Sequence, residues 1–291
     1  MTTAQYGGPP AGPTVTRMLL GAQLRRLREA KGITREDAGY AIRASESKIS
    51  RLELGRVSFK ERDVLDLLTL YDITDERERD DVLALVRNAN TPGWWYRYND
   101  LLPTWFQSYL GLEAAASLIR TYEVQFIPGL LQTEAYARAV ILLGHGSARP
   151  DEVERRVKLR LERRLILSRP NPPEFWAVVD EAVLRRPIGG RAVMREQLKT
   201  LIDLIQQPWM RLQVIPFAAG GHAAAGGAFC ILRFPEPDIR DVVYVEQLTS
   251  ALYLDKADDV DLYTEAMSRL SIDATLPSQT TEILGNILHD M

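Results

Sequence analysis

Several patterns that mark common protein classes are missing from this sequence. It holds one cysteine, Cys230, so an internal disulfide is excluded. No run of about 18 apolar residues occurs, and no charged start followed by an apolar core opens the chain, so neither a membrane-spanning helix nor an export signal is predicted. We therefore expect a cytoplasmic protein, with Cys230 buried in a strand between Phe229 and Ile231.

The motifs of metal sites and of common enzymes are also missing. His145, His222 and His289 lie far apart, and none has a second His or Cys at a zinc-binding spacing. The glycine-rich stretch Gly220 to Gly227 lacks the Gly-Lys-Ser/Thr ending of a phosphate-binding loop, so we interpret it as a flexible hairpin or lid. No pattern supports a catalytic serine or cysteine. We predict no enzymatic activity, no catalytic residue, no metal and no cofactor.

The composition is that of an ordinary globular protein, with 46% hydrophobic and 26% charged residues. The length of 291 residues exceeds one small domain, and we expect two. Residues 1–16 contain three prolines and three glycines and are predicted to be a disordered tail. The predicted domains are 17–90 and 91–291, with an aromatic-rich junction at 92–110.

Two short helices joined by a tight turn are predicted between Thr34 and Gly55. Thr34 precedes the first helix with Asp37 three residues on, and Ser45 precedes the second, so both helices begin where a side-chain oxygen can accept an exposed N–H. Apolar residues at helical spacing lie within, before and after the pair. They predict five helices in the first ninety residues.

These residues resemble the Xre family of helix-turn-helix regulators, in which the third helix runs Ser-x-x-x-Ile-Ser-x-Leu-Glu-x-Gly, as Ser45 to Gly55 do here. The chain departs from the family at Ala38-Gly39, where Leu-Ala is usual, and at Arg43, where Gly is frequent. The first change predicts weaker core packing, and the second argues against an unusual backbone conformation at Arg43. The resemblance implies an all-α, five-helix, lambda-repressor-like domain whose third helix lies in the major groove of double-stranded DNA.

The resemblance also assigns DNA-facing residues. Arg51 could pair with a guanine and Glu46 could accept from a cytosine, so these two are the best candidates for sequence choice. The full base-facing set is Glu46, Ser47, Ser50 and Arg51, and the backbone-facing set is Thr34, Arg35 and Lys48. The alternatives are a helical bundle with an accidental turn and an Xre fold used only for protein contact.

Charge supports DNA binding. Residues 17–62 hold twelve Lys or Arg against six Asp or Glu, whereas residues 63–90 hold three against eight. Positive charge is thus concentrated on the segment predicted to meet the phosphate backbone.

The C-terminal part is predicted to be an α/β or α+β domain with one mixed sheet, because strand-like runs follow and alternate with helical patterns. Trp94, Trp95, Trp105, Phe106 and Tyr109 belong to an aromatic cluster, for which packing is favoured over the wall of a pocket. The predicted helices are Gly111–Tyr122, Gln132–Leu143, Asp151–Ser168, Met194–Gln206, Ala257–Leu270 and Ser278–Leu288, and the predicted strands are Glu174–Asp180, Arg211–Phe217, Ala228–Phe234 and Asp241–Val245.

A second resemblance covers Trp94 to His289. Three runs are similar to the C-terminal domain of antitoxin-like, actinobacterial Xre regulators, a group that includes the sporulation regulator WhiJ. They are Pro128-Gly129-Leu130-Leu131-Gln132-Thr133-Glu134, Asp180-Glu181-Ala182 and Val243-Tyr244-Val245-Glu246. The resemblance implies a transcriptional regulator of development or secondary metabolism, frequently acting with a small partner protein. The domain is of unknown function, so it implies little chemistry.

A possible ligand or partner site in this domain rests on a few residues. Asp180, Glu181 and Glu246 lie near predicted strand ends, where ligand sites in open sheets occur, but capping a helix or pairing with Arg185 or Arg186 is the favoured interpretation. The candidates are Trp94, Trp95, Asp180, Glu181, His222 and Glu246.

The leading functional hypothesis is a sequence-specific DNA-binding regulator, dimeric because one such unit reads only a few base pairs. In this hypothesis the C-terminal domain makes the dimer and receives a signal. The second hypothesis is an antitoxin-like protein whose C-terminal domain mainly binds a small cognate partner protein. The third is an enzyme with a DNA-targeting head.

Overall fold

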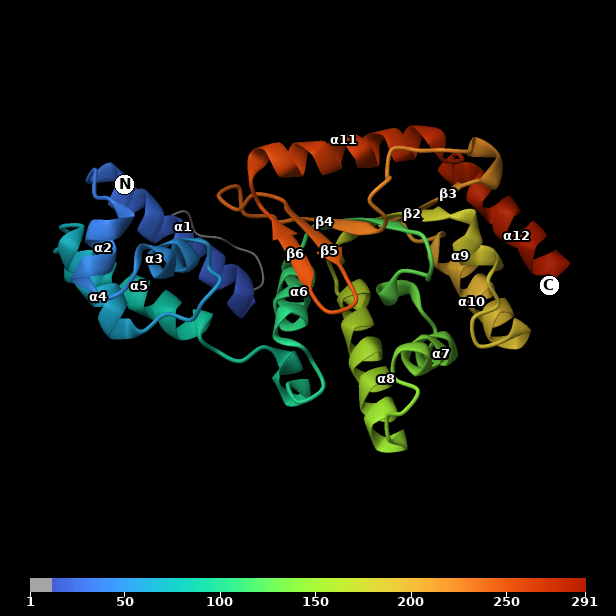
Figure 1. The fold of residues 1–291 in the computed structure, drawn as a ribbon, viewed down its shortest axis with the longest axis horizontal. Coiled ribbons are helices and arrows are strands. Elements are labelled where there is room, and N and C mark those ends of the chain that lie inside the picture. The colour runs from blue at the N-terminus through green and yellow to red at the C-terminus, as the bar shows by residue number, and fades with distance from the viewer. Residues whose placement is uncertain (1–11) are drawn as a thin grey trace. The chain divides into compact units, whose positions relative to one another are not determined.

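The structure is a computed structural model that describes residues 12–291 (Figure 1). It divides into two compact units. The first runs to Arg97 and includes Leu110–Ala115 and Glu236–Ile239, and the second comprises Tyr98–Tyr109, Ala116–Pro235 and Arg240–Met291. Of the predicted disordered tail, residues 1–11 lie outside the described residues, and Pro13 to Thr16 belong to the first helix. The domain limits given above stay a prediction.

The first unit is all-α, and its five predicted helices are confirmed. They are α1 (Pro13–Ala30), α2 (Arg35–Ala41), α3 (Glu46–Glu53), α4 (Glu61–Leu70) and α5 (Glu76–Ala89). One apolar core joins them, because each helix directs its apolar face inward. Its most deeply buried members include Leu20, Ala38, Ile49, Leu68 and Val86. A short 3-10 helix, Trp94–Tyr98, follows α5.

The second unit is built on a six-stranded mixed sheet in the order β3-β2-β1-β4-β5-β6. Strands β1, β2 and β3 are parallel, and β4, β5 and β6 continue the sheet antiparallel from β1. The predicted fold class is therefore confirmed. The strands are β1 (Leu118–Glu123), β2 (Glu174–Asp180), β3 (Met210–Ile215), β4 (Phe229–Arg233), β5 (Val242–Glu246) and β6 (Ala251–Leu254).

Helices cover both faces of this sheet. α11 lies along one face, and α7 and α8 lie on the opposite side (Figure 1). Met267 and Leu270 of α11 pack with Tyr122 and Val178 in a buried cluster, so α11 covers this face of the sheet. The helices are α6 (Thr104–Ala115), α7 (Glu134–Gly144), α8 (Pro150–Arg164), α9 (Glu181–Arg185), α10 (Arg191–Leu204), α11 (Ala257–Asp273) and α12 (Thr280–Asp290).

The prediction of one helix over Gly111–Tyr122 is wrong. α6 ends at Ala115, and β1 begins at Leu118 and forms the centre of the sheet. The β-branched and aromatic residues Ile119, Thr121 and Tyr122 favour a strand, and all three are buried. Strand β6, only four residues long, was also not predicted.

Candidate nucleic-acid interface

Side-chain caps fix the starts of the two helices of the predicted DNA-binding motif. The Thr34 hydroxyl accepts a hydrogen bond from the backbone N–H of Asp37 at 3.1 Å, which begins α2. The Ser45 hydroxyl accepts from the backbone N–H of Lys48 at 3.3 Å, which begins α3. Both predicted caps are confirmed, and each satisfies an N–H that has no partner inside its helix.

The turn between α2 and α3 differs from the expectation. Arg43 adopts a φ of 54°, in the left-handed region that favours glycine, so the argument against an unusual conformation there is wrong. The reason lies in the tight geometry of the turn, because Ala44 N–H donates to Gly39 O at 2.8 Å. A Cβ at Gly39 would lie 2.7 Å from Ala44 O, so the glycine allows a close approach of the two segments. Ala38 is fully buried in the core, and the expectation of weaker packing there stays a prediction.

Buried ion pairs hold α3 in place. Glu53, at the end of α3, is 5% exposed and accepts a hydrogen bond from Nε of Arg28 in α1 at 2.5 Å. Arg35, the first residue of α2, donates from Nε to the other Glu53 oxygen at 3.1 Å. Hydrogen bonding to Glu53 raises the pKa of Arg28. Two cations on one buried carboxylate therefore fix α3 relative to α1 and α2.

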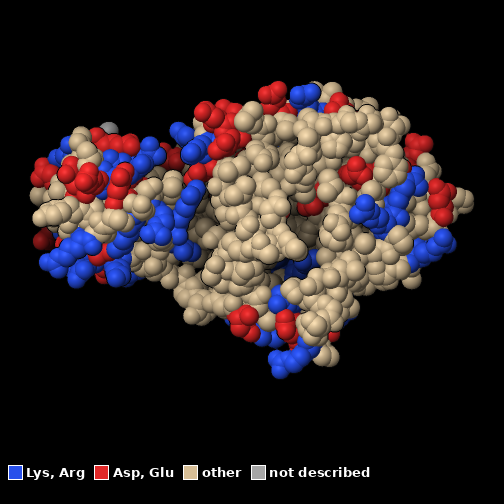
Figure 2. Space-filling model, in the orientation of Figure 1, with Lys and Arg blue, Asp and Glu red and all other residues tan. Residues whose placement is uncertain are grey.

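Charge is unevenly spread over the surface of this unit. Figure 2 shows Lys and Arg gathered in its lower part and Asp and Glu more densely in its upper part. Along the sequence, residues 17–62 carry a positive balance and residues 63–90 a negative one. A surface with such a contrast can orient a phosphate polyanion before contact.

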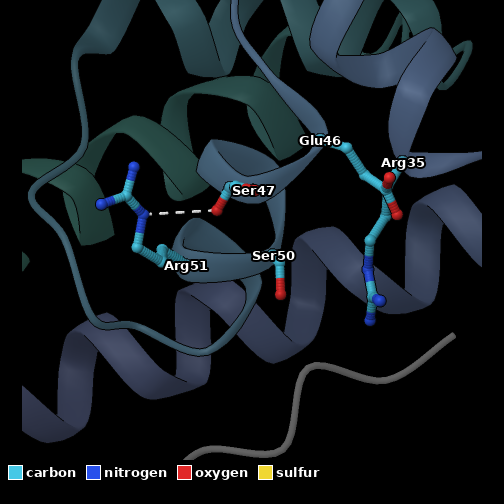
Figure 3. Close-up of a pocket in the computed structure, with 5 residues that line it drawn as sticks. All are labelled: Arg35, Glu46, Ser47, Ser50 and Arg51. Carbon is cyan, nitrogen blue, oxygen red and sulfur yellow. Dashed lines mark hydrogen bonds between the residues drawn. The ribbon is translucent and has the colours of Figure 1, made fainter.

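Five of the seven predicted DNA-facing residues line one hollow on the surface of α2 and α3 (Figure 3). It has a volume of about 560 Å³ and is lined by Arg35, Glu46, Ser47, Ser50 and Arg51. Nε of Arg51 donates to the backbone oxygen of Ser47 at 3.3 Å, drawn as the dashed line in Figure 3. The opposite face of α3 carries Ile49 and Leu52, which are buried in the core. The helix thus presents Glu46, Ser47, Ser50 and Arg51 outward as one group.

Two of the seven predicted residues lie elsewhere. Thr34 caps α2, and its hydroxyl also donates to a carboxylate oxygen of Asp37 at 2.7 Å. Lys48 Nζ lies 2.7 Å from Oδ2 of Asp63, which is buried at the start of α4. Lys48 therefore ties α3 to α4, a role that the sequence motif alone did not indicate.

The candidate residues of the second unit are mostly structural. The Asp180 carboxylate accepts from the backbone N–H of Ala182 at 2.8 Å and caps α9, as the favoured interpretation predicted. Glu181 pairs with Arg185 at 2.6 Å and accepts from the backbone N–H of Phe217 at 2.9 Å. The hydrogen bonds from Phe217 and Arg185 outweigh the effect of burial and hold the pKa of Glu181 below its usual value.

The remaining candidates are dispersed. Nε2 of His222 lies 2.8 Å from the hydroxyl of Tyr122, and its Nδ1 accepts from the backbone N–H of Ala224. Trp94 and Trp95 belong to the first unit, where their rings meet edge to face at 5.8 Å. The six candidates therefore do not form one site.

Glu246 alone of these candidates lines a large cavity of the second unit. It neither caps a helix nor pairs with an arginine, and it accepts from the Tyr244 hydroxyl at 2.8 Å. Trp105, Phe106 and Tyr109 line the same cavity. For these three residues of the aromatic cluster, the structure therefore agrees with the wall of a pocket, the less favoured of the two interpretations. Cys230 is buried in β4 as predicted and also reaches this cavity.

Glu123 is the functional candidate that sequence reasoning missed. It ends β1 and lines the cavity with Glu246, and burial raises the pKa of its carboxyl to about 8, helped by the negative charge of Glu246. The missing signal was β1 itself, because the segment was predicted to be helical up to Tyr122. A carboxylate after a central strand would have drawn attention to this end of the sheet.

Residues 12–291 contain neither a metal-binding cluster nor a membrane-spanning helix. No group of three or more His, Cys, Asp or Glu side chains in this range could hold a metal ion. Within the same residues, every helix is too short or too polar to cross a membrane.

Comparisons with known proteins identify both parts of the chain. Residues 19–82 match a helix-turn-helix domain, a DNA-binding fold, which supports a DNA-binding regulator. Residues 106–286 match a domain of unknown function, DUF5753. No curated protein and no solved structure gives a significant match. Because the second match covers more than half of the 291 residues, the chain belongs to the DUF5753 family, with a helix-turn-helix domain preceding that domain.

Proposed function

We propose that this protein is a sequence-specific transcriptional regulator that reads DNA with α3 in the major groove. One observation carries the proposal: five of the seven residues predicted from sequence to face DNA line a single surface hollow, while the other face of α3 packs in the core. A recognition helix needs this division, because base readout requires a polar face that the fold does not use.

The chemistry of the hollow suits base and phosphate contacts. The planar guanidinium of Arg51 can donate to both acceptors of a guanine, and the Glu46 carboxylate can accept from the amino group of a cytosine. Arg35 begins α2, where exposed N–H groups and a positive side chain favour a phosphate oxygen. Ser47 and Ser50 add short hydroxyl groups that can donate or accept at base edges.

The regulator acts as a dimer in this proposal, since two copies on half-sites about one helical turn apart would multiply the affinity of a single short recognition helix. Control of development or secondary metabolism is supported by the resemblance to Xre regulators that carry a similar C-terminal domain.

Fluorescence anisotropy on DNA from upstream of its own gene tests this proposal. The full chain should bind that duplex more tightly than a scrambled one, with two chains per duplex. Affinity for both should fall when salt rises from 50 to 200 mM, because phosphate contacts release counterions. Equal binding to the two duplexes at physiological salt would contradict sequence-specific recognition of this DNA.

A further inference from the structure

The second unit contains a cavity of about 860 Å³, within the size range of sites for small organic molecules. All the residues that line it belong to this unit. Its floor is formed by the last residues of β1 and β5 and the first residues of β4. Its walls come from α6, α7 and α8. The cavity lies apart from the DNA-facing hollow, whose lining residues are all in the first unit.

The strand register places two acidic side chains on this floor with a gap between them. Tyr122 pairs with Phe229, and Cys230 pairs with Tyr244. Continuing these antiparallel pairings puts Ala228 opposite both Glu123 and Glu246, so the three form one row across the sheet. The two glutamates are then two strand spacings apart, about 10 Å between Cα atoms. The small side chain of Ala228 leaves the space between them open.

Glu123 is half-buried and Glu246 is exposed, and each accepts one side-chain hydrogen bond. Glu123 accepts one long hydrogen bond, from the Thr121 hydroxyl at 3.4 Å, and Glu246 accepts one from the Tyr244 hydroxyl at 2.8 Å. Among residues 12–291, no Lys or Arg forms an ion pair with either. Burial raises the pKa of Glu123 to about 8, and the charge of Glu246 adds to this. Burial disfavours the ionised form of Glu123, and a positive charge placed beside this carboxylate would stabilise that form.

The arginines of the cavity wall are engaged in other contacts. Arg156 donates to Glu152 at 2.8 Å and to the backbone oxygen of Leu101 at 3.0 Å. Arg160 donates to the side-chain oxygen of Gln132 at 2.8 Å. The guanidinium of Arg163 lies over the rings of Phe106 and Tyr109, at 5.2 and 5.6 Å from their centroids. None of these contacts involves Glu123 or Glu246, so the three arginines build the wall while the two glutamates lie on the floor.

Aromatic rings form a continuous surface beside the two glutamates. Phe106 and Tyr109 stack at 5.6 Å, and Tyr109 stacks on Tyr244 at 4.2 Å, with interplanar angles of 27° and 28°. Trp105 lies next to Phe106 at the cavity wall. Tyr109 and Tyr244 are buried, so these rings form an apolar wall against which a flat apolar body can pack.

We propose that this cavity binds a small organic cation with a flat apolar body, whose ammonium group lies between Glu123 and Glu246 and whose ring system lies on Phe106, Tyr109 and Tyr244. This ligand site goes beyond DNA recognition and does not depend on it. The bound cation pairs with both carboxylates once Glu123 has released its proton.

Binding is coupled to ionisation of Glu123. The titratable or charged groups around it are Glu246 and Tyr244 on β5, Tyr109 on α6, Tyr136 and His145 from the α7 segment, and Arg156, Arg160 and Arg163 on α8. At pH 6 the cation must displace a proton from Glu123, whereas above pH 8 the carboxylate is already ionised. Affinity for an amine that stays protonated therefore rises between pH 6 and pH 8.

Isothermal titration calorimetry on the full chain without DNA tests the site. The probes are two cations of different size, tryptamine and propranolol, with neutral tryptophol and anionic indole-3-acetate as matched analogues of tryptamine. We expect at least one of the two cations to bind. If tryptamine binds, its affinity should exceed that of each of its two analogues by at least about tenfold. Glu123→Gln and Glu246→Gln should each weaken binding by at least about tenfold, whereas Glu174→Gln, which changes an exposed residue at the start of β2, should not.

Several outcomes would overturn the proposal. These are a preference for indole-3-acetate, equal binding of the three indoles, no binding of either cation at millimolar concentration, or unchanged affinity in both cavity variants. If Glu123→Gln fails to fold, as judged by circular dichroism, Glu246→Gln decides alone. Since no DNA is present, a failure here is distinct from a failure of DNA recognition.

Discussion

At the scale of single residues, the buried carboxylate of Glu53 accepts from both Arg28 and Arg35 and so connects three helices. Removing it would leave the Arg28 guanidinium, which is 7% exposed, buried without its main counterion. The cost of such a change exceeds the net stabilisation that the pair provides, because a buried unpaired charge is strongly unfavourable.

We therefore predict that Glu53→Ala lowers the free energy of unfolding by about 3 to 5 kcal/mol. Glu29→Ala is the matched control, since Glu29 pairs with Arg25 on the surface of α1 and should contribute less than about 1 kcal/mol. Urea denaturation followed by circular dichroism measures both. Equal losses in the two variants would show that the buried network does not hold the unit together.

Glu123 gives a prediction for pH. Its pKa is raised from 4.5 to about 8 in the folded chain, so between these values the folded state binds a proton that the unfolded state has released. This contribution to stability is complete below pH 4.5 and is lost as pH rises through about 8. The melting temperature of the wild type, relative to Glu123→Gln, should fall between pH 5 and pH 8. Parallel melting curves across this range, as expected for Glu174→Gln, would contradict the raised pKa.

The sequence predicted some residues of the site well and others poorly, for physical reasons. Thr34 and Ser45 were predicted correctly because a helix cap depends on a local pattern of three or four residues. Lys48 and Glu53 have partners 15 and 25 residues away, and no local pattern encodes such pairings. The same limit applies to Glu123, whose meaning depends on strands that meet only in the folded sheet.

At the scale of elements, the close approach of α2 to the turn before α3 depends on Gly39. A Cβ there would lie 2.7 Å from the backbone oxygen of Ala44, and backbone cannot move aside as a flexible side chain can. We predict that Gly39→Ala destabilises the chain by about 1 to 3 kcal/mol, despite the better helix propensity of alanine. Gly285→Ala in α12 meets nothing within 4 Å and should be neutral or stabilising by up to about 1 kcal/mol. Thermal unfolding of both variants compares them, and a stabilised Gly39→Ala would show that the turn has room.

Most elements could be predicted from periodicity, because long amphipathic helices and strands bounded by turn residues carry strong local signals. The predicted strand Glu174–Asp180 matches β2 at both ends. The failure at β1 has a specific cause, since α6 and β1 are separated by only Ala116 and Ser117, and their apolar residues merge into one helical pattern. Tertiary pairing with β2 and β4 decides the conformation there.

At the scale of the whole molecule, the chain combines a helical unit, whose positive charge is concentrated in residues 17–62, with a unit that contains a cavity. Concentrating positive charge in residues 17–62 of an otherwise acidic chain favours contact of this segment with DNA phosphates. Base recognition by α3 is the central claim of this account, and it depends most on Arg51.

The most direct test of that claim is anisotropy binding of wild type, Arg51→Ala and Arg77→Ala to a selected duplex and to copies in which each guanine is replaced in turn. Arg77 is exposed on α5, outside the hollow, and serves as the control. We predict that Arg51→Ala weakens binding to the selected duplex by about 1 to 3 kcal/mol. We also predict that the affinity of this variant does not change when one particular guanine is replaced. A variant that still discriminates at every guanine, or that loses no more affinity than Arg77→Ala, would contradict base reading by Arg51.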